Sequence, residues 1–224
     1  KLCDKRIKVI HQDNGGVSAA RAAGVRYASG DYLYFLDSDD AIECDTLKAM
    51  LEYMSKDIDI VIFECSRTSI LSKDEYAKEC GKLYRRQLFD YVVTVPRQFN
   101  IGEDFLMQLR LLNNIQNSIK TVNIHKYYYN KESVTSVQQG RKQSCEYEVN
   151  FIKEAERSIS KTIAASPLID ECFYKWKVKY LGGLTSLQCK LDYSAPWIVE
   201  ILKKKDNYKL SIKERNTIRS INHN

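Results

Sequence analysis

The stretch HQDNGGVSAARAAGVRYASGDYLYFLDSDD, residues 11–40, predicts the fold class of this chain. Turn-forming residues at 13–16 precede an alanine-rich segment at 17–28, which is typical of a helix, and Gly30 is expected to end that helix. The apolar, β-prone run at 31–36 then predicts a buried strand of a mostly parallel sheet. A turn, a helix and a buried strand in this order indicate an α/β fold.

The sequence on both sides of this stretch continues the alternation. Strands are expected at 6–11, 57–65 and 118–130, and helices at 44–56, 82–93 and 102–114. The apolar residues of the helix at 44–56 are expected to face the core, and they are Leu47, Met50, Leu51 and Met54. Strands and helices in alternation predict a layered sheet with helices on its faces.

After about Ser136 the sequence changes to long, basic stretches with helical periodicity. These stretches cover residues 145–165, 168–184 and 195–218. We therefore expect two parts, an α/β core at 1–136 and a helical C-terminal region at 137–224. No apolar run approaches the ~20 residues that a membrane-spanning helix needs.

The composition narrows the classes of protein to consider. A chain of 224 residues with 44% hydrophobic content can bury a core. Its 35 basic and 29 acidic residues give a net charge of only +6, which lacks the concentrated excess of a dedicated nucleic-acid binder. A mildly basic surface suits phosphate ligands or anionic lipid headgroups.

The cysteines show no metal-binding or redox spacing. There are seven of them, so one stays unpaired in any full disulfide scheme, and none forms a CxxC motif. They are Cys3, Cys44, Cys65, Cys80, Cys145, Cys172 and Cys189. This pattern predicts free thiols in a reducing cytoplasm.

A cluster of acidic residues follows the predicted strand at 31–36. Ligands of open α/β sheets bind at the carboxyl ends of strands, where Asp37, Asp39 and Asp40 are expected to lie. These carboxylates repel one another, and a divalent cation such as Mg²⁺ offsets that repulsion while keeping substrate phosphates in its shell. The alternative is that they are ordinary turn and capping residues before the next helix.

The turn at Asn14, Gly15 and Gly16 leads into the first predicted helix. Its backbone N–H groups and the positive end of the helix can face a phosphate or a nucleotide. Arg21, one turn further on, can reach a diphosphate through its planar guanidinium. The alternatives are a plain Asn-Gly turn and a solvated charge.

A second acidic pair, Glu103 and Asp104, starts the predicted helix at 102–114. One of these carboxylates can serve as a general base for an acceptor hydroxyl if it faces the reacting carbon. The alternative is a first-turn acid pair that only stabilises the start of the helix. His125 is open between a metal or phosphate contact and a structural role, and Tyr127, Tyr128 and Tyr129 between core packing and a stacking surface.

Four segments in order resemble family 2 of the glycosyltransferases. They are HQDNGGVSAARAAGVRYASGDYLYFLDSDD at 11–40, CGKLYRRQLF at 80–89, GEDFLMQLRLL at 102–112 and YYYNKESVTS at 127–136. The resemblance covers roughly residues 6–136. It implies the GT-A fold, a Rossmann-like, mostly parallel sheet with flanking helices, here followed by a helical C-terminal extension.

The family's motifs then imply roles for particular residues. Its DxD aspartates bind the metal and the nucleotide, which points to Asp37 and Asp39, with Asp39 the favoured ligand of Mn²⁺ or Mg²⁺. Its acidic pair supplies the catalytic base, which points to Asp104 with Glu103 beside it. The donor pocket carries over to Asn14, Gly15, Gly16, Ser18 and Arg21.

The chain departs from the family's pattern in two places. The opening strand and the Asp-rich turn of the DDGSTD type do not precede Lys1, so we expect a fragment that lacks the start of the nucleotide-binding domain. The interval between IVIFE at 60–64 and CGKLY at 80–84 is short for the family, and acceptor-binding segments usually lie in that interval.

The expected activity is transfer of a sugar, with inversion, from a nucleotide-diphosphate donor to a glycan or lipid-linked acceptor. The expected setting is bacterial cell-surface polysaccharide synthesis. The alternative is a truncated, non-catalytic binding module of the same fold, and an RNA-binding protein is a distant third.

The basic C-terminal region suggests a place for the protein in the cell. Trp176 lies among Lys175, Lys177 and Lys179, and three further lysines stand at 203–205. These residues can rest on anionic lipid at the inner face of the cell membrane. A solvated helix face or the surface of a homodimer is the alternative.

Overall fold

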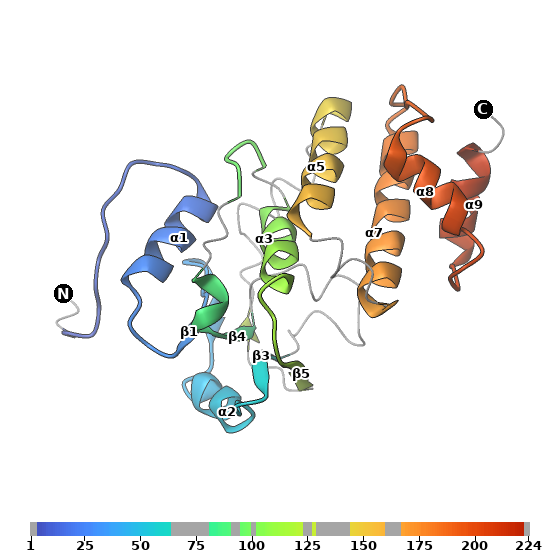
Figure 1. Ribbon diagram of the computed structural model, residues 1–224. Helices are drawn as coiled ribbons and strands as arrows, with labels where there is room; N and C mark the ends of the chain where they lie inside the picture. Colours follow the sequence, from blue (N-terminus) through green and yellow to red (C-terminus); the bar gives the residue numbers. More distant parts are fainter. Residues whose placement is uncertain are drawn as a thin grey trace. The chain divides into compact units, whose positions relative to one another are not determined.

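The computed structural model describes residues 4–63, 81–90, 95–99, 102–122, 127–128, 144–159 and 167–221. The chain divides into two compact units, Lys1–Val137 and Gln138–Asn224. The first unit holds a sheet with flanking helices, and the second is helical (Figure 1). The expected α/β fold class is therefore confirmed.

The main sheet of the described part has four strands, β1 (Tyr32–Tyr34), β3 (Ile58–Phe63), β4 (Lys82–Arg85) and β5 (Ser118–Val122). Their order across the sheet is β1-β4-β3-β5. Only β3 and β5 run parallel, because β4 is antiparallel to both of its neighbours. The expectation of a mostly parallel sheet is therefore wrong for the described strands.

Strand β4 also corrects the helix predicted at 82–93. Residues 82–85 pair with strands on both sides, and the short 3₁₀ helix η2 (Arg86–Phe89) follows them. Leu83 and Tyr84 are both buried although they point to opposite faces of the sheet. Because both faces of β4 are buried, its sequence lacks the alternation of polar and apolar residues that is typical of a half-buried strand. Pairing with β1 and β3 then outweighs the helical preference of the segment.

The two faces of the sheet are covered by different helices, α2 (Thr46–Glu52) and α3 (Glu103–Leu112). On one face, Met50 of α2 packs with Val61, Phe63 and Leu83. On the other face, the side-chain amide of Gln108 on α3 donates to the hydroxyl of Tyr84, at 2.7 Å. Figure 1 shows α2 and α3 on different sides of β3 and β4.

The helix expected at 44–56 is shorter than predicted and buries less of its apolar surface. Met50 is fully buried, whereas Leu47 and Leu51 keep 41% and 46% of their surface exposed. Met54 lies beyond the last residue of α2 but still packs against the core. A helix of 7 residues makes only about two turns, so it can direct only a few side chains toward the sheet.

The strand expected at 6–11 does not form. Residues 7–16 have no helix or strand, and Ile7 and Val9 are 53% and 73% exposed. No described strand pairs with this segment, and an unpaired strand leaves its backbone groups without partners. The alternating sequence alone is therefore not enough to make it part of the sheet.

A buried carboxylate, Asp59 on β3, ties the strand to the chain before β5. Asp59 accepts hydrogen bonds from the N–H groups of Gln116 and Asn117, both at 2.8 Å, and pairs with Arg85 at 3.3 Å. Burial raises the pKa of Asp59, but these hydrogen bonds and the charge of Arg85 outweigh it and lower the pKa overall. Asp59 therefore acts as a structural clamp.

A small second sheet lies directly after the first acidic cluster. Strand β2 (Ala41–Ile42) pairs antiparallel with β6 (Tyr127–Tyr128). The hydroxyl of Tyr128 also donates to Glu43, at 2.5 Å. The strand expected at 118–130 is therefore seen as β5 and β6, while His125 and Tyr129 lie outside the described residues.

The second unit is a helical bundle, as the sequence predicts. Its helices are α5 (Cys145–Ser158), α7 (Pro167–Ser186), α8 (Pro196–Lys204) and α9 (Ile212–Ile221). They enclose a core whose fully buried members include Ile152, Val178, Leu181, Leu184, Ile198 and Ile201. None of the described helices is both long enough and apolar enough to cross a membrane.

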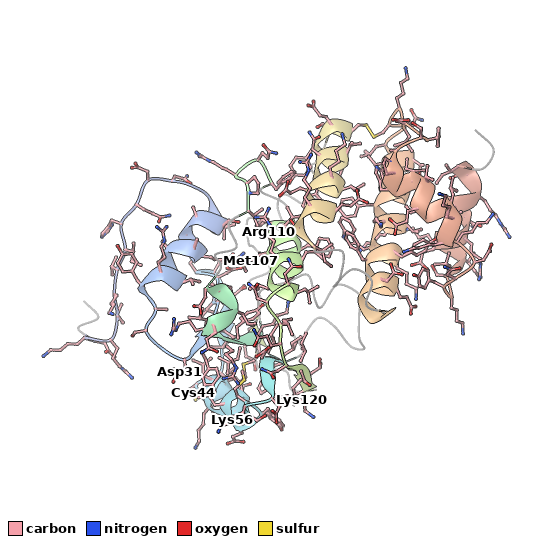
Figure 2. All side chains as sticks on the ribbon, viewed as in Figure 1. Asp31, Cys44, Lys56, Met107, Arg110 and Lys120 are labelled. Atoms are coloured by element: carbon pink, nitrogen blue, oxygen red, sulfur yellow. A yellow bond between two sulfur atoms is a disulfide. The ribbon has the colours of Figure 1, made fainter. Side chains whose placement is uncertain are left out.

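The cysteine prediction is wrong for two residues of this unit. Cys145, at the start of α5, and Cys189, after α7, form a disulfide across a Cα–Cα distance of 5.6 Å (Figure 2). The two residues are far apart in sequence, and only the packing of α5 beside α7 brings them within bonding range. Cys44, labelled near α2 in Figure 2, is a free and exposed thiol.

Several of the basic residues assigned to a lipid surface are used inside this unit instead. Lys177 is only 2% exposed and pairs with Glu200 and, at 3.6 Å, with Glu156. Lys204 pairs with Asp170 at 2.8 Å. Trp176 packs against the helical core rather than standing clear of it.

Candidate active site

The entry to helix α1 (Val17–Tyr27) is shaped by Asn14, Gly15 and Gly16. The side-chain oxygen of Asn14 accepts from the N–H of Gly16 at 3.1 Å, which closes a tight turn. Gly16 has φ 83° and ψ 173°, a conformation that is essentially restricted to glycine. A Cβ atom at Gly15 would lie 2.7 Å from the Cβ of Ala19, so a larger residue does not fit there.

After this turn, the first residues of α1 can bind an anion. The helix has no acidic residue in its first turn, and its first N–H groups have no partners within the helix. Ser18 lies half-buried in the same turn. The turn and the helix start can therefore receive a phosphate group.

The most informative contact of the site is made by Arg21, one turn into α1. Its guanidinium donates to Oδ1 of Asp104 on α3 and, at 3.1 Å, to Oδ1 of Asp37. The Arg21 side chain is 10% exposed, whereas those of Asp37 and Asp104 are 49% and 26% exposed. Arg21 thus joins the two acidic clusters that the sequence places far apart.

The first cluster forms a turn at the end of β1. The N–H of Asp40 donates to the carbonyl of Asp37 at 3.1 Å, and the Asp39 carboxylate is exposed. Asp39 makes no salt bridge to a residue that the structure describes, so it is not tied to Arg21 as Asp37 and Asp104 are.

The chemistry of Asp37 and Asp39 is that of hard oxygen ligands for a divalent cation. The described residues contain no group of three Asp, Glu, His or Cys side chains that could enclose a metal ion. Mg²⁺ in nucleotide sites needs only one or two carboxylates, since substrate phosphates and water fill the other positions. Asp37 and Asp39 supply the number of carboxylates that such an ion needs, and the described residues do not form a closed protein cage.

The second cluster opens helix α3, where Glu103 and Asp104 occupy the first turn. Burial raises the pKa of Glu103 to about 7, and the negative charges of Asp104 and Asp37 act in the same direction. A carboxyl group with such a pKa exchanges its proton near neutral pH. Arg21 contacts Oδ1 of the Asp104 carboxylate, and Oδ2 makes no hydrogen bond to a described residue.

The structure therefore brings together Asp37, Arg21, Glu103 and Asp104 from the predicted residues, with the turn at 14–16 at the start of the same helix as Arg21. The pairing of Arg21 with Asp104 was not predicted. Asp104 can be picked out from the sequence because it starts a helix, and Asp37 because it follows a strand. No local sequence pattern shows that Arg21 lies between these two carboxylates.

Comparisons with a family model and with curated proteins point to the same family. A family model described as "Glycosyl transferase family 2" matches residues 1–117, more than half of the 224 residues. EpsH of Bacillus subtilis, a glycosyltransferase by name, is 46% identical over 59 residues, which cover 26% of this chain and 17% of EpsH. Glycosyltransferase GlyG of Streptococcus pneumoniae is 36% identical over 61 residues, which cover 26% of this chain and 20% of GlyG.

A solved structure is similar to this chain, with a lower sequence identity than these relatives have. The crystal structure of S. aureus TarS 1-349 aligns with a TM-score of 0.49 and 14% identity over 96% of this chain and 73% of that chain. The matches to EpsH and GlyG span a fifth or less of each relative. The family assignment therefore rests on the sequence match.

Proposed function

Because the chain belongs to glycosyl transferase family 2, we propose that it transfers a sugar from a nucleotide-diphosphate donor to an acceptor hydroxyl with inversion. Its α/β sheet with flanking helices has the GT-A fold of that family. The observation that carries the proposal is the contact of Arg21 with both Asp37 and Asp104, which makes one polar site from residues of two clusters.

The charges of this site suit the proposed reaction. A leaving diphosphate gains negative charge as the sugar departs, and Arg21, the start of α1 and a cation held by Asp37 and Asp39 would together supply positive charge beside it. Asp104 would take the proton of the acceptor hydroxyl through Oδ2 as that oxygen attacks the anomeric carbon. Attack from the side opposite the diphosphate forms the new bond to the sugar with inverted configuration.

Asp37 and Asp39 would hold a Mn²⁺ or Mg²⁺ ion together with the diphosphate. When bound, the ion supplies positive charge that stabilises the leaving group. Asp37 already contacts Arg21, so the ion and the guanidinium would meet the phosphates from neighbouring positions. The exposed Asp39 can turn toward the ion without breaking a salt bridge to a described residue.

For the acceptor we propose only a class of molecule, whereas for the reaction we propose roles for particular residues. We propose a glycan or lipid-linked acceptor in cell-surface polysaccharide synthesis, since the relatives that match the chain are bacterial glycosyltransferases by name. The matched segments cover only part of those relatives, so the acceptor is proposed by analogy with them and not read from the match.

The test is a panel of nucleotide sugars with Mn²⁺, assayed for transfer and hydrolysis with the wild-type chain and Asp104→Asn. We expect kcat/KM to fall by about 10²–10⁴ in the variant, while donor affinity measured by calorimetry stays within about threefold of wild type. Asp31→Asn is the matched control, because Asp31, labelled in Figure 2, is exposed and precedes β1, whereas Asp37 follows it.

Two outcomes would overturn the proposal in different ways. Donor binding without turnover by any member of the panel would favour the non-catalytic binding module. Full activity of Asp104→Asn would leave the family assignment intact but remove Asp104 as the base.

A further inference from the structure

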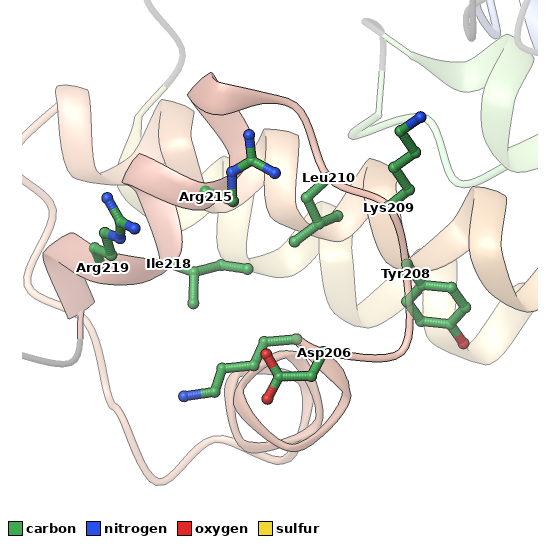
Figure 3. A pocket seen from close by; sticks show the side chains of 8 residues that line it. Asp206, Tyr208, Lys209, Leu210, Arg215, Ile218 and Arg219 are labelled. Carbon is green, nitrogen blue, oxygen red and sulfur yellow. The ribbon is translucent and has the colours of Figure 1, made fainter.

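The second unit contains a pocket of about 380 Å³ between the segment that follows α8 and helix α9 (Figure 3). Its cationic lining consists of Lys205, Lys209, Arg215 and Arg219. We propose that this pocket binds the phosphate group of a phosphorylated ligand. The pocket belongs to a different unit from Arg21 and Asp104, so the inference does not depend on the proposed function.

The cations of the pocket differ from several other basic residues of the unit, which pair with acids. Lys177, for example, pairs with Glu200, and Lys204 pairs with Asp170. None of the four cations of the pocket makes a salt bridge to a described residue. Asp206 is the single acid in the lining, so the pocket keeps a surplus of positive charge.

Two of the four cations stand close together on helix α9. Arg215 and Arg219 are one helical turn apart and lie on the same side of α9, where two positive charges repel each other. An anion between their guanidinium groups relieves that repulsion. The forked donors of arginine match phosphate oxygens in pairs, which makes phosphate the anion of choice.

The floor of the pocket is apolar and fixed. Leu210 and Ile218 are only 6% and 4% exposed, and Figure 3 shows them between the basic side chains. The hydroxyl of Tyr208 is held by Asp170, so the tyrosine ring forms a stable wall. A volume of about 380 Å³ is within the range of small-molecule sites, so a phosphate with an attached organic group fits.

The test titrates the full chain with inorganic pyrophosphate by calorimetry, in EDTA so that metal-dependent binding in the first unit is absent. We expect a dissociation constant below ~1 mM for wild type, and at least tenfold weaker binding for Arg215→Gln/Arg219→Gln. Lys205→Gln/Lys209→Gln should also weaken binding. The matched control is Lys190→Gln/Lys213→Gln, which removes two exposed charges outside the pocket and should bind as wild type does.

A second arm distinguishes a soluble phosphate from a lipid headgroup. The same variants are sedimented with phosphatidylcholine vesicles that contain phosphatidic acid. Binding to vesicles that Arg215→Gln/Arg219→Gln abolishes supports a lipid phosphate, and binding of pyrophosphate alone supports a soluble one. No binding of either probe by wild type, or equal binding by the pocket and control variants, would overturn the proposal.

Discussion

At the scale of single residues, one guanidinium is surrounded by a surplus of acids. Arg21 contacts both Asp37 and Asp104, and Glu103 lies beside Asp104 at the start of α3. One positive charge cannot neutralise three carboxylates, so the site favours a proton or a further cation. The pKa of Glu103 is raised chiefly by burial, and the negative charge of Asp104 adds to the effect.

Glu103 should therefore make the stability of the chain depend on pH. The group keeps its proton up to about pH 7 in the folded chain but loses it near 4.5 when unfolded. Its contribution is fully present below pH 4.5 and is lost as the pH rises through 7. In urea denaturation, Glu103→Gln should gain on the order of 3 kcal/mol relative to wild type between pH 4.5 and 8.

The control for this experiment is Glu52→Gln, which changes an exposed glutamate at the end of α2. Its stability should follow that of wild type across the whole pH range. If the difference between Glu103→Gln and wild type is the same at every pH, Glu103 does not hold a proton in the folded chain.

The sequence alone singled out the acids of the candidate site, but it did not predict their contacts. Asp37 follows an apolar run and Asp104 stands in the first turn of a periodic helix, and both patterns are local. The pairing of Arg21 with Asp104 depends on how α1 lies against α3. A contact of this kind is fixed by tertiary packing, which no window of sequence contains.

At the scale of elements, the entry of α1 depends on backbone conformation. Gly16 adopts φ 83° and ψ 173°, so Gly16→Ala should cost about 1–3 kcal/mol of unfolding free energy. Gly24→Ala is the matched change within the same helix, where an added Cβ meets no atom within 4 Å. It should stabilise the chain by about 0.5–1 kcal/mol, because alanine favours a helix interior.

Chemical denaturation of the two variants checks this contrast. Donor binding should also weaken in Gly16→Ala alone, because the variant disturbs the turn that presents the start of α1. Equal stabilities for Gly16→Ala and Gly24→Ala would show that the turn at 14–16 relaxes without cost.

Helices were predicted better than strands. Helices α1 and α3 were expected at nearly their observed positions, whereas α5 begins at the expected residue but ends at Ser158, before the predicted end at 165. Strand β4 was missed because both of its faces are buried and its sequence, KLYR, carries no alternation. The predicted strand at 6–11 failed for the opposite reason, since it has the alternation but no described partner.

At the scale of the whole molecule, the division into two units was expected near residue 136, where the sequence becomes helical and basic. The cross-link within the second unit was not expected. Seven scattered cysteines carry no sign of which two will meet, and the pair is decided by the packing of α5 and α7. A disulfide that closes a long loop restricts the unfolded chain more than the folded one.

Removing this disulfide should destabilise the unit formed by Gln138–Asn224. The bond joins residues 44 positions apart, and a loop of that size is worth about 2–4 kcal/mol. Hydrogen exchange of Cys145→Ser/Cys189→Ser should show faster exchange, most strongly in peptides from α5 and α7, than in oxidised wild type. Cys44→Ser removes the exposed free thiol and should leave exchange unchanged, whereas unchanged exchange in the double variant would show that the bond contributes no stability.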